Sequence, residues 1–313
     1  MQSFIQDLGC FNARRDSRAE AVLDWDAGIR YTWGDLQACA QKLAVFFTRE
    51  QGLSKGDRVG FLCQNTVVMI ASYYASLATG IVITAYNYRL NEQDLISIVE
   101  EESPSILFFT KESEEKASRL QKICAASFLL VSVDEGCQVD AFLLSDIMKT
   151  DLDEGFLPAE VSEEDPAMLA HTGGTTGRPK AAILSHRSIF LNAVSELVSM
   201  HVNDRDCAYV CMPFFHTGGW NVFTLPLLLA GGRIVLTREF SPELFFEIAE
   251  KEKPTVCMAA DMMYQSLVKH PLFQESDLTC FRWVIGGASA ISESSMRPFW
   301  DKGVRFFTGY GMT

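Results

Sequence analysis

The sequence is short of positive charge, and this shortage limits the partners that it can have. Its 313 residues include 27 Lys and Arg against 40 Asp and Glu, a formal net charge of −13. Residues 100–165 alone hold 17 acidic and 5 basic residues, while the remainder is close to neutral. No basic stripe with interleaved aromatic residues occurs, so nucleic acid is not expected as a partner. We interpret the acidic stretch as solvated helix faces and a connector.

Metal-binding and targeting signals are also missing. None of the nine cysteines forms a C-x-x-C pair and no His cluster accompanies them, so a zinc site is not expected. An odd number of cysteines without a secretion signal is typical of reduced thiols in a cytoplasmic protein. The longest weakly charged run, residues 211–232, contains Pro213, Pro226 and a central His216. These residues favour a buried strand, loop and helix over a transmembrane helix.

Two common nucleotide-binding patterns are absent, but a third kind of loop is present. No G-x-G-x-x-G follows a predicted strand, and Arg178 and Pro179 separate Gly177 from Lys180, unlike the P-loop. Glycines let backbone N–H groups approach phosphate oxygens, threonine hydroxyls add donors, and a lysine adds positive charge. We therefore predict a polyphosphate-binding loop. It consists of Thr172, Gly173, Gly174, Thr175, Thr176, Gly177 and Lys180.

Short apolar runs alternate with amphipathic segments, which predicts βαβ units and a mostly parallel sheet. The predicted strands are residues 58–63, 81–85, 106–110, 128–133, 168–171, 207–212, 233–236, 255–259, 282–285 and 304–308. The predicted helices include 67–78, 92–101, 185–200, 242–252 and 292–302. A connector at 152–165 predicts two α/β subdomains, 1–165 and 166–313. Because ligands of such folds bind at the carboxyl ends of strands, the phosphate loop, 286–288 and 309–313 are expected to line one crevice.

The loop resembles the phosphate loop of the AMP-forming adenylating enzymes, the superfamily of acyl-CoA synthetases, luciferases and peptide-synthetase adenylation domains. Their pattern is [ST]-[ST]-G-T-T-G-x-P-K-G; here Gly173 replaces a hydroxyl residue and Ala181 replaces the last glycine. Four further segments match in the family's order: Y-T-W-G-D-L at 31–36, M-P-F-F-H-T-G-G at 212–219, G-G-A at 286–288 and G-Y-G-M-T at 309–313. The F-H-x-x-G-G form points to acyl-CoA synthetases. The resemblance implies two packed, doubly wound, mostly parallel sheets with helices.

The resemblance also implies a reaction and its site. ATP would activate a small carboxylic acid to an acyl-adenylate with the help of Mg²⁺, and coenzyme A would then take the acyl group. Lys180 would neutralise the β- and γ-phosphates, and Thr313 would hydrogen-bond the α-phosphate. Tyr310 would stack on adenine. The other nucleotide contacts would come from Gly287, Ala288, Ser289, Gly309, Gly311 and Met312.

The acid would be held by the segment around His216. The family implies that His216 orients the carboxylate or gates the acid pocket; a general base is not needed, because the acid is already ionised at neutral pH. Trp220, Asn221 and Tyr264 would contact the acid, and Asp261 stands where family members commonly have proline. No cation obviously awaits a second carboxylate, which favours an apolar acyl or aryl acid. The loop itself does not distinguish fatty, aryl and amino acids.

Family members continue beyond the position of Thr313. A magnesium-binding glutamate, a β-barrel subdomain and a C-terminal domain with the adenylation lysine would follow there. The resemblance therefore implies an N-terminal piece that binds nucleotide poorly and catalyses little alone. Two alternatives stay open, a catalytically inactive adenylate-binding remnant and an adenylation module that loads a carrier protein. A homodimer is also left open.

Overall fold

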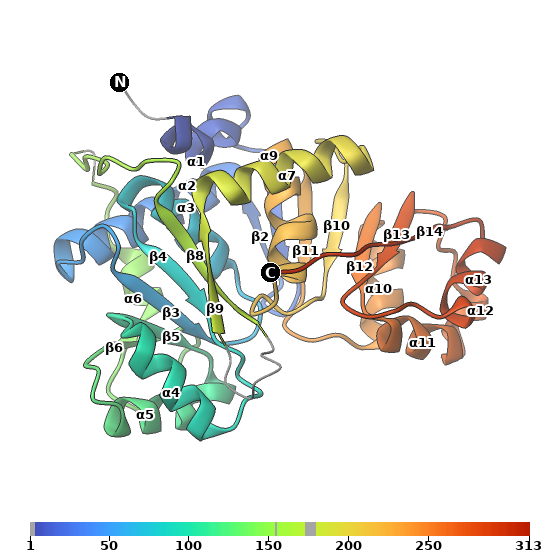
Figure 1. The fold of residues 1–313 in the computed structure, drawn as a ribbon. Helices are drawn as coiled ribbons and strands as arrows, with labels where there is room; N and C mark the ends of the chain where they lie inside the picture. The colour runs from blue at the N-terminus through green and yellow to red at the C-terminus, as the bar shows by residue number, and fades with distance from the viewer. Residues whose placement is uncertain (1–3, 154, 173–179) are drawn as a thin grey trace. The chain divides into compact units, whose positions relative to one another are not determined.

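The computed structural model describes residues 4–153, 155–172 and 180–313, and these form two compact units (Figure 1). The first unit comprises Met1–Ala19 with Thr32–Ile189, and the second comprises Glu20–Tyr31 with Phe190–Thr313. Each unit contains one seven-stranded, mostly parallel sheet with helices. The predicted α/β fold class, with two such sheets, is therefore confirmed.

The sheet of the first unit has the strand order β7-β6-β5-β3-β4-β8-β9. Its strands are β3 (Arg58–Leu62), β4 (Val82–Ala85), β5 (Ile106–Phe109), β6 (Leu129–Ser132), β7 (Phe142–Leu143), β8 (Pro166–Thr172) and β9 (Lys180–Ser185). The helices are α1 (Phe4–Arg15), α2 (Trp33–Val45), α3 (Val67–Thr79), α4 (Glu92–Glu102), α5 (Glu114–Ile123) and α6 (Leu144–Lys149). Helices α1 to α3 lie on one side of this sheet and α4 and α5 on the other (Figure 1). Only β9, among the described strands of this sheet, is antiparallel to its neighbour.

Helix α2 begins where the Y-T-W-G-D-L segment places it. The Thr32 hydroxyl accepts a hydrogen bond from the Asp35 amide at 3.1 Å, and the Asp35 carboxylate accepts one from the Thr32 amide at 2.9 Å. This reciprocal capping box satisfies two N–H groups that a helix start leaves without partners. The predicted helix start at this segment is thus confirmed by its cap.

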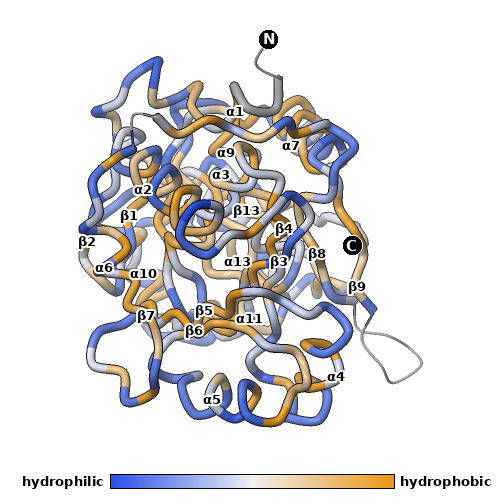
Figure 2. Tube along the Cα trace, turned by 90° about the vertical axis from the view of Figure 1, so that its left-hand side faces the viewer, coloured by the Kyte–Doolittle hydropathy of each residue, from blue (hydrophilic) through white to orange (hydrophobic). Residues whose placement is uncertain are grey.

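The apolar strand residues form the interior of the first unit. Figure 2 shows hydrophobic colour along β5 and β6 and mixed colour on α4 and α5, as expected for strands covered on both faces by amphipathic helices. The Phe61 and Phe108 rings stack at 5.0 Å between neighbouring strands. Gly60 on β3 leaves room for the Tyr86 ring, because a Cβ there would lie 2.5 Å from Cε2 of Tyr86.

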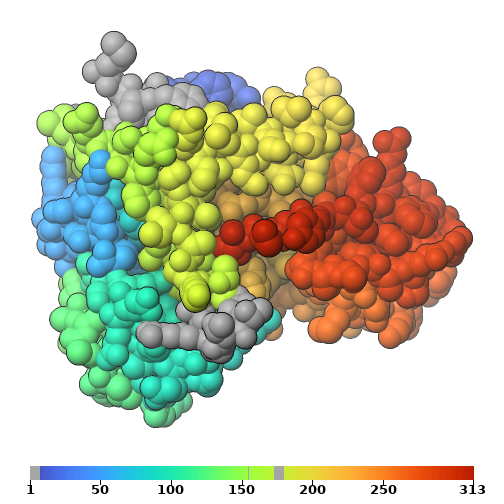
Figure 3. Space-filling view, in the orientation of Figure 1, coloured from blue at the N-terminus to red at the C-terminus, as the bar shows by residue number. Residues whose placement is uncertain are grey.

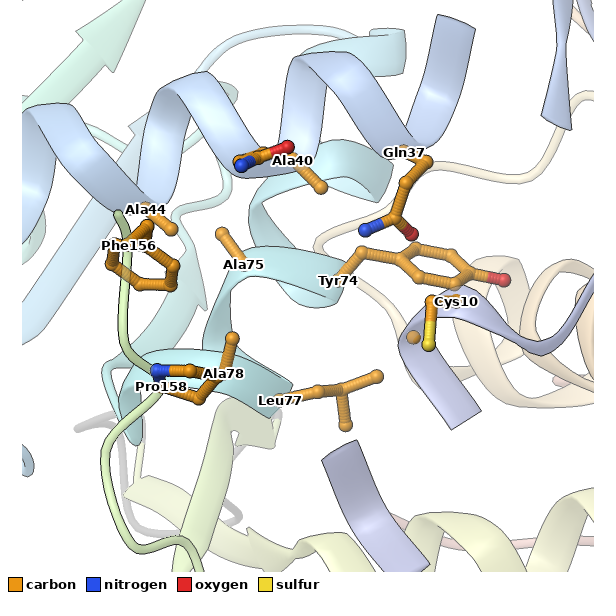
Figure 4. Close-up of a pocket in the computed structure, with 12 residues that line it drawn as sticks. Cys10, Gln37, Ala40, Ala44, Tyr74, Ala75, Leu77, Ala78, Phe156 and Pro158 are labelled. Atoms are coloured by element: carbon orange, nitrogen blue, oxygen red, sulfur yellow. The ribbon is translucent and has the colours of Figure 1, made fainter. Parts of the chain in front are cut away.

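A small cavity of about 180 Å³ lies among α1, α2, α3 and residues 156–158. Figure 4 shows Cys10, Gln37 and Tyr74 at one end and Phe156 with Pro158 at the other. Its walls are otherwise small side chains, among them Ala40, Ala44, Ala75 and Ala78. Such residues let helices approach closely but do not fill the space between them, so a gap is left in the packing.

The sheet of the second unit has the order β14-β13-β12-β10-β11-β1-β2. Its strands are β1 (Glu20–Asp24), β2 (Ile29–Thr32), β10 (Cys207–Val210), β11 (Arg233–Leu236), β12 (Val256–Ala259), β13 (Trp283–Gly286) and β14 (Arg305–Thr308). The helices are α8 (Thr217–Gly219), α9 (Leu225–Ala230), α10 (Pro242–Glu252), α11 (Asp261–Lys269), α12 (Leu272–Glu275) and α13 (Glu293–Asp301); α7 (His186–Met200) begins in the first unit and ends in this one. Phe245, Tyr264, Phe273 and Phe299, from the four helices α10 to α13, meet in one buried core cluster.

These unit ranges differ from the predicted subdomains 1–165 and 166–313, for two reasons. Strand β1 pairs in parallel with β11, which takes residues 20–31 into the second unit. Arg233 reinforces this pairing, since its guanidinium lies 2.8 Å from Glu20 and 2.7 Å from Glu252. In the other direction, β8 pairs with β4, which keeps residues up to 189 in the first unit.

We expect Gly60→Ala to destabilise the first unit. The added methyl group would meet the Tyr86 ring, and overpacking of this kind costs about 1–3 kcal/mol. Gly9→Ala in α1 is the matched control, because a Cβ there would have only ordinary contacts of 3.4 Å or more, with Leu77 and Tyr74 of α3. Urea unfolding of both variants measures the difference. Equal midpoints for Gly60→Ala and the natural protein would contradict the tight contact.

Candidate active site

The two described ends of the predicted phosphate loop face each other at the end of a strand pair. Thr172 is the last residue of β8, Lys180 is the first of β9, and the two are paired in register. The Thr172 hydroxyl donates to the Lys180 carbonyl at 3.1 Å. Lys180 is exposed and makes no ion pair within the described part of the chain. The predicted contacts Gly173, Gly174, Thr175, Thr176 and Gly177 lie outside the described residues.

In the second unit, two predicted nucleotide segments lie side by side. Strands β13 and β14 are parallel neighbours with Gly286 paired to Thr308, so their following residues leave the same edge of the sheet. The Gly309 amide donates to the Gly286 carbonyl at 2.9 Å. A Cβ at Gly287 would lie 3.5 Å from the Gly309 carbonyl oxygen, and a Cβ at Gly309 would lie 2.9 Å from Cδ1 of Ile285. The structure therefore brings the G-G-A and G-Y-G segments together through glycine backbone.

The side chains beyond these glycines are open to solvent. Tyr310 is 93% exposed and Met312 is 84% exposed, and Figure 3 shows the residues after β14 as a dark red strip on the surface. Ala288, Ser289, Gly311 and Thr313 are also exposed. Ala288 has a φ of 67°, a left-handed conformation that costs a residue with a Cβ about 1–2 kcal/mol. Strain of this kind is found at functional sites, and here it turns the chain sharply after β13.

His216 stands on a tight turn after β10. The His216 amide donates to the Pro213 carbonyl at 3.0 Å, and the Gly219 amide donates to the His216 carbonyl at 2.9 Å. Only glycine fits at 219, since a Cβ would lie 2.5 Å from the Pro213 carbonyl oxygen. Phe214 and Trp220 are buried and stack at 4.4 Å, whereas His216 is exposed with its ring 4.6 Å from that of Phe215. The turn thus buries its aromatic residues and presents the imidazole.

Met258 was not predicted as a site residue, yet it lies between the two candidate segments of the second unit. Its methyl group would be 2.9 Å from a Cβ at Gly287 and 3.4 Å from a Cβ at Gly218. The cavity beside it measures only about 10 Å³ and is also lined by Gly218 and Phe223. Methionine is unbranched and adaptable, so its side chain can make room for a ligand at low cost. A lone methionine in a strand carries no sequence signal for this role.

Of the three other residues predicted to contact the acid, Trp220 and Tyr264 are buried and Asn221 is half-buried. Trp220 is 1% exposed. The Asn221 carbonyl accepts from Asn192 at 2.7 Å, and its buried side-chain oxygen has no hydrogen-bond partner among the described residues. Tyr264 is fully buried in the core cluster and donates its hydroxyl to the Ile285 carbonyl at 2.9 Å. Burial raises the pKa of Tyr264 well above its usual value.

Asp261, at the position of the family's proline, begins α11 and joins it to α13. Its carboxylate accepts from the Ser292 amide at 2.9 Å and from the Ser295 hydroxyl at 2.7 Å. The Ser292 amide bond, followed by these hydroxyl bonds, holds the pKa of Asp261 below its usual range. This carboxylate is used to fix two helices against each other.

Comparison with known proteins decides which family this geometry represents. A family model described as AMP-binding enzyme matches residues 11–313. The chain belongs to this family. The predicted resemblance to the AMP-forming adenylating enzymes is thereby confirmed, and the curated relatives are named as CoA ligases and synthases.

The relatives of this AMP-binding chain are longer than it is. A feruloyl-CoA synthase from an Amycolatopsis species is 30% identical over 309 residues, which are 98% of this chain and 60% of that protein. The long-chain-fatty-acid–CoA ligase of Bacillus subtilis (strain 168) is 26% identical, covering 91% of this chain and 56% of the relative. The chain thus spans about 60% of the length of the first of these relatives.

Solved structures share the fold. The inhibitor-bound N-terminal domain of FACL13 from Mycobacterium tuberculosis matches with a TM-score of 0.88 at 22% identity, covering 100% of this chain and 76% of that one. ATP-bound MatB from Rhodopseudomonas palustris matches with a TM-score of 0.84 at 23% identity, covering 98% and 60%. At these identities the likeness is one of fold.

Within residues 4–153, 155–172 and 180–313, no three His, Cys, Asp or Glu side chains gather as they would to hold a metal ion. Over the same ranges, no helix has the length and apolar character needed to cross a bilayer.

His186, the first residue of α7, is buried without a side-chain partner. It is 1% exposed, and neither ring nitrogen has a hydrogen-bond partner among the described residues. Its backbone amide, not its ring, is used here, donating to the Asp165 carbonyl at 3.1 Å. Burial lowers the pKa of His186 from 6.5 to about 4, because water no longer stabilises the imidazolium.

His186 should therefore make the protein sensitive to acid. Between pH 6.5 and 4 the His186 side chain is protonated in the unfolded chain but neutral in the folded chain. The contribution of His186 to the free energy of unfolding is therefore complete above pH 6.5 and falls as the pH drops toward 4. The loss amounts to about 3 kcal/mol. Denaturant unfolding from pH 7.5 to 4.5 should show a shallower decline for His186→Gln. Parallel curves for the variant and the natural protein would contradict the buried neutral imidazole.

Proposed function

We propose that the chain is the nucleotide- and acid-binding part of an AMP-forming acid–CoA ligase. Its reaction joins ATP and a small carboxylic acid into an acyl-adenylate with release of pyrophosphate, and coenzyme A then displaces AMP to form the thioester. The observation that carries the proposal is the meeting of Gly287 and Gly309 at the ends of β13 and β14, in a chain that belongs to the AMP-binding family over residues 11–313.

The first step has an electrostatic problem that the loop residues would solve. A carboxylate must attack the α-phosphate of ATP, so two anions meet and their charge must be neutralised while they are held in line. Backbone amides of the loop and the hydroxyls of Thr172, Thr175 and Thr176 would bind the β- and γ-phosphates, with Lys180 as counter-charge. Mg²⁺ fits this arrangement as an ion that enters with the phosphates, because it keeps few protein ligands in such sites.

The second unit would hold the adenine and the acid. Gly287 and Gly309 leave the space that a flat base needs, and the exposed ring of Tyr310 can stack on it. Thr313 would contact the α-phosphate, with Ala288, Ser289, Gly311 and Met312 beside the nucleotide. His216 would orient the acid's carboxylate beside Trp220 and Asn221, and movement of Met258 would open the apolar part of the pocket. The Tyr264 hydroxyl is buried and bound to the Ile285 carbonyl of β13, so Tyr264 would support this strand and would not contact the acid itself.

The described residues that line the small cavity beside Met258 are glycines and apolar or aromatic residues: Tyr209, Val210, Cys211, Met212, Gly218, Gly219, Phe223 and Met258. Such a lining favours an apolar acyl or aryl acid, and the similarity to a feruloyl-CoA synthase and a long-chain-fatty-acid–CoA ligase supports both classes. ATP–pyrophosphate exchange over a panel of aryl and fatty acids, followed by thioester formation with coenzyme A, tests the proposal. Exchange without thioester formation favours a module that loads a carrier protein. No exchange with any acid, with AMP still bound, favours a catalytically inactive adenylate-binding remnant.

Lys180→Ala should weaken ATP binding by about ten- to a hundredfold, the value of one charge-assisted hydrogen bond. Folding should not change, because Lys180 is exposed and its side chain has no ion-pair partner in the described ranges. Lys122→Ala, at an exposed position on α5, is the control. Calorimetric titration with ATP measures the affinity. A dissociation constant equal to that of the control would refute the counter-charge role.

His216→Ala should lower kcat with the acid by roughly a hundredfold, as expected for the loss of one orienting donor, and should leave AMP affinity within about twofold. We expect the two effects to differ because His216 lies on the turn after β10, whereas the glycines of the adenine site follow β13 and β14. His270→Ala, between α11 and α12 of the same unit, is the control. Equal losses in acid turnover and AMP affinity would show that His216 is only structural.

A further inference from the structure

The strand pair that carries the phosphate loop extends beyond its pairing with the rest of the sheet. The register between β4 and β8 joins Ile83 to Met168 and Thr84 to Leu169. Strand β8 continues for three residues past that last pair, to Thr172, and stays paired with β9 up to Lys180. The last residues of β8 therefore determine where the loop begins, and their position depends on side chains.

His171 connects this projecting end of β8 to α4 and β4. Its Nε2 lies 2.7 Å from the Glu102 carboxylate, and its Nδ1 lies 3.3 Å from the Ala85 carbonyl oxygen. The second Glu102 oxygen accepts from the Thr84 hydroxyl at 2.9 Å. The side chains of His171 and Glu102 are only 9% and 6% exposed. Two residues distant in sequence are thus joined by a hydrogen bond between largely buried side chains, and such a bond is stronger than one in water.

Glu102 lies where a carboxylate is energetically unfavourable, so it is not there only to fill space. It is the last residue of α4, where the helix dipole is negative and disfavours a carboxylate. It is also buried, and a buried polar pair is rarely more stabilising than apolar side chains of the same size. What such a pair provides is a defined geometry. Arg58 stabilises the same helix end by donating to the backbone carbonyls of Glu102 and Ser103.

Three contacts fix the orientation of the His171 ring. Its two nitrogens face oxygen acceptors, and its ring lies 5.7 Å from the Tyr86 ring, for which Gly60 leaves the space. The open side of the cluster is a groove of about 710 Å³ that is lined by His171, Glu102 and Lys180 together. The cluster and the lysine of the loop therefore share one cavity within the first unit.

We propose that Glu102 and His171 are positioning residues that hold the end of β8, and with it Thr172 at the start of the phosphate loop, in place for binding the ATP phosphates. Neither residue touches the nucleotide. The inference rests on the proposed function for its effect on ATP, but its structural part, the fixing of the strand pair, stands independently.

Two variants of the whole chain test this proposal. Glu102→Gln keeps the shape and removes the charge, and His171→Phe removes both ring nitrogens. Each should weaken ATP binding about tenfold, and the double variant no more than the larger single loss, since the residues act as one unit. His171→Gln, which can still donate to Glu102, should restore most of the affinity. Glu243→Gln is the control, because Glu243 contacts His270 at 3.1 Å in the other unit.

Hydrogen exchange provides the readout that a loss of overall stability would not give. Backbone amides of residues 181–185 should exchange about tenfold faster in Glu102→Gln and His171→Phe, while amides of β5 and β6 are unchanged. Unchanged ATP affinity and unchanged exchange would overturn the proposal. The proposal would also be overturned if the losses of ATP affinity add in the double variant and merely parallel a lower unfolding midpoint. If the natural chain binds no ATP, the proposed function fails, while the exchange measurement still decides the positioning role.

Discussion

The site in the second unit depends on two backbone segments meeting at the ends of neighbouring parallel strands. Parallel strands end at the same edge of a sheet, so Gly287 and Gly309 follow β13 and β14 at one place. A side chain at either position would run into Met258 or Ile285. Glycine there lets the chain leave the sheet at once, and it leaves Tyr310 exposed beside a tightly packed core. A flat apolar ligand is what such an edge can accept.

In the first unit, the glycine-rich loop is carried by the β8–β9 strand pair, and polar contacts hold this pair in place. The β8–β9 strand pair has buried polar residues near both of its ends, and they differ in whether their polar atoms have hydrogen-bond partners. Glu102 and His171 have partners for their polar atoms, so they can fix a geometry. His186 has none among the described residues and stays neutral through burial. His186 lies at the end of the strand pair away from the loop, where Ser185 pairs with Pro166, so Glu102 and His171 are the polar pair at the base of the loop.

Much of the fold follows from local sequence patterns, and the exceptions are contacts between distant residues. The parallel strands, the capped start of α2 and the family motifs are local, so the sequence predicts them. Pairing of Val22 with Ile234 is not local, and it places residues 20–31 in the second unit. Periodicity cannot tell whether Tyr264 faces a pocket or the core, which the packing of α11 decides. Met258 and the contact between Glu102 and His171 likewise have no signal in either segment alone.

A crystal structure of the chain with AMP is the most direct test of the central claim, that the ends of β13 and β14 form an adenine site. We expect electron density for the base against the backbone of Gly287 and Gly309, with the Tyr310 ring stacked on it. Density for the adenine at any other place, with these residues unchanged and unoccupied at saturating AMP, would contradict the account.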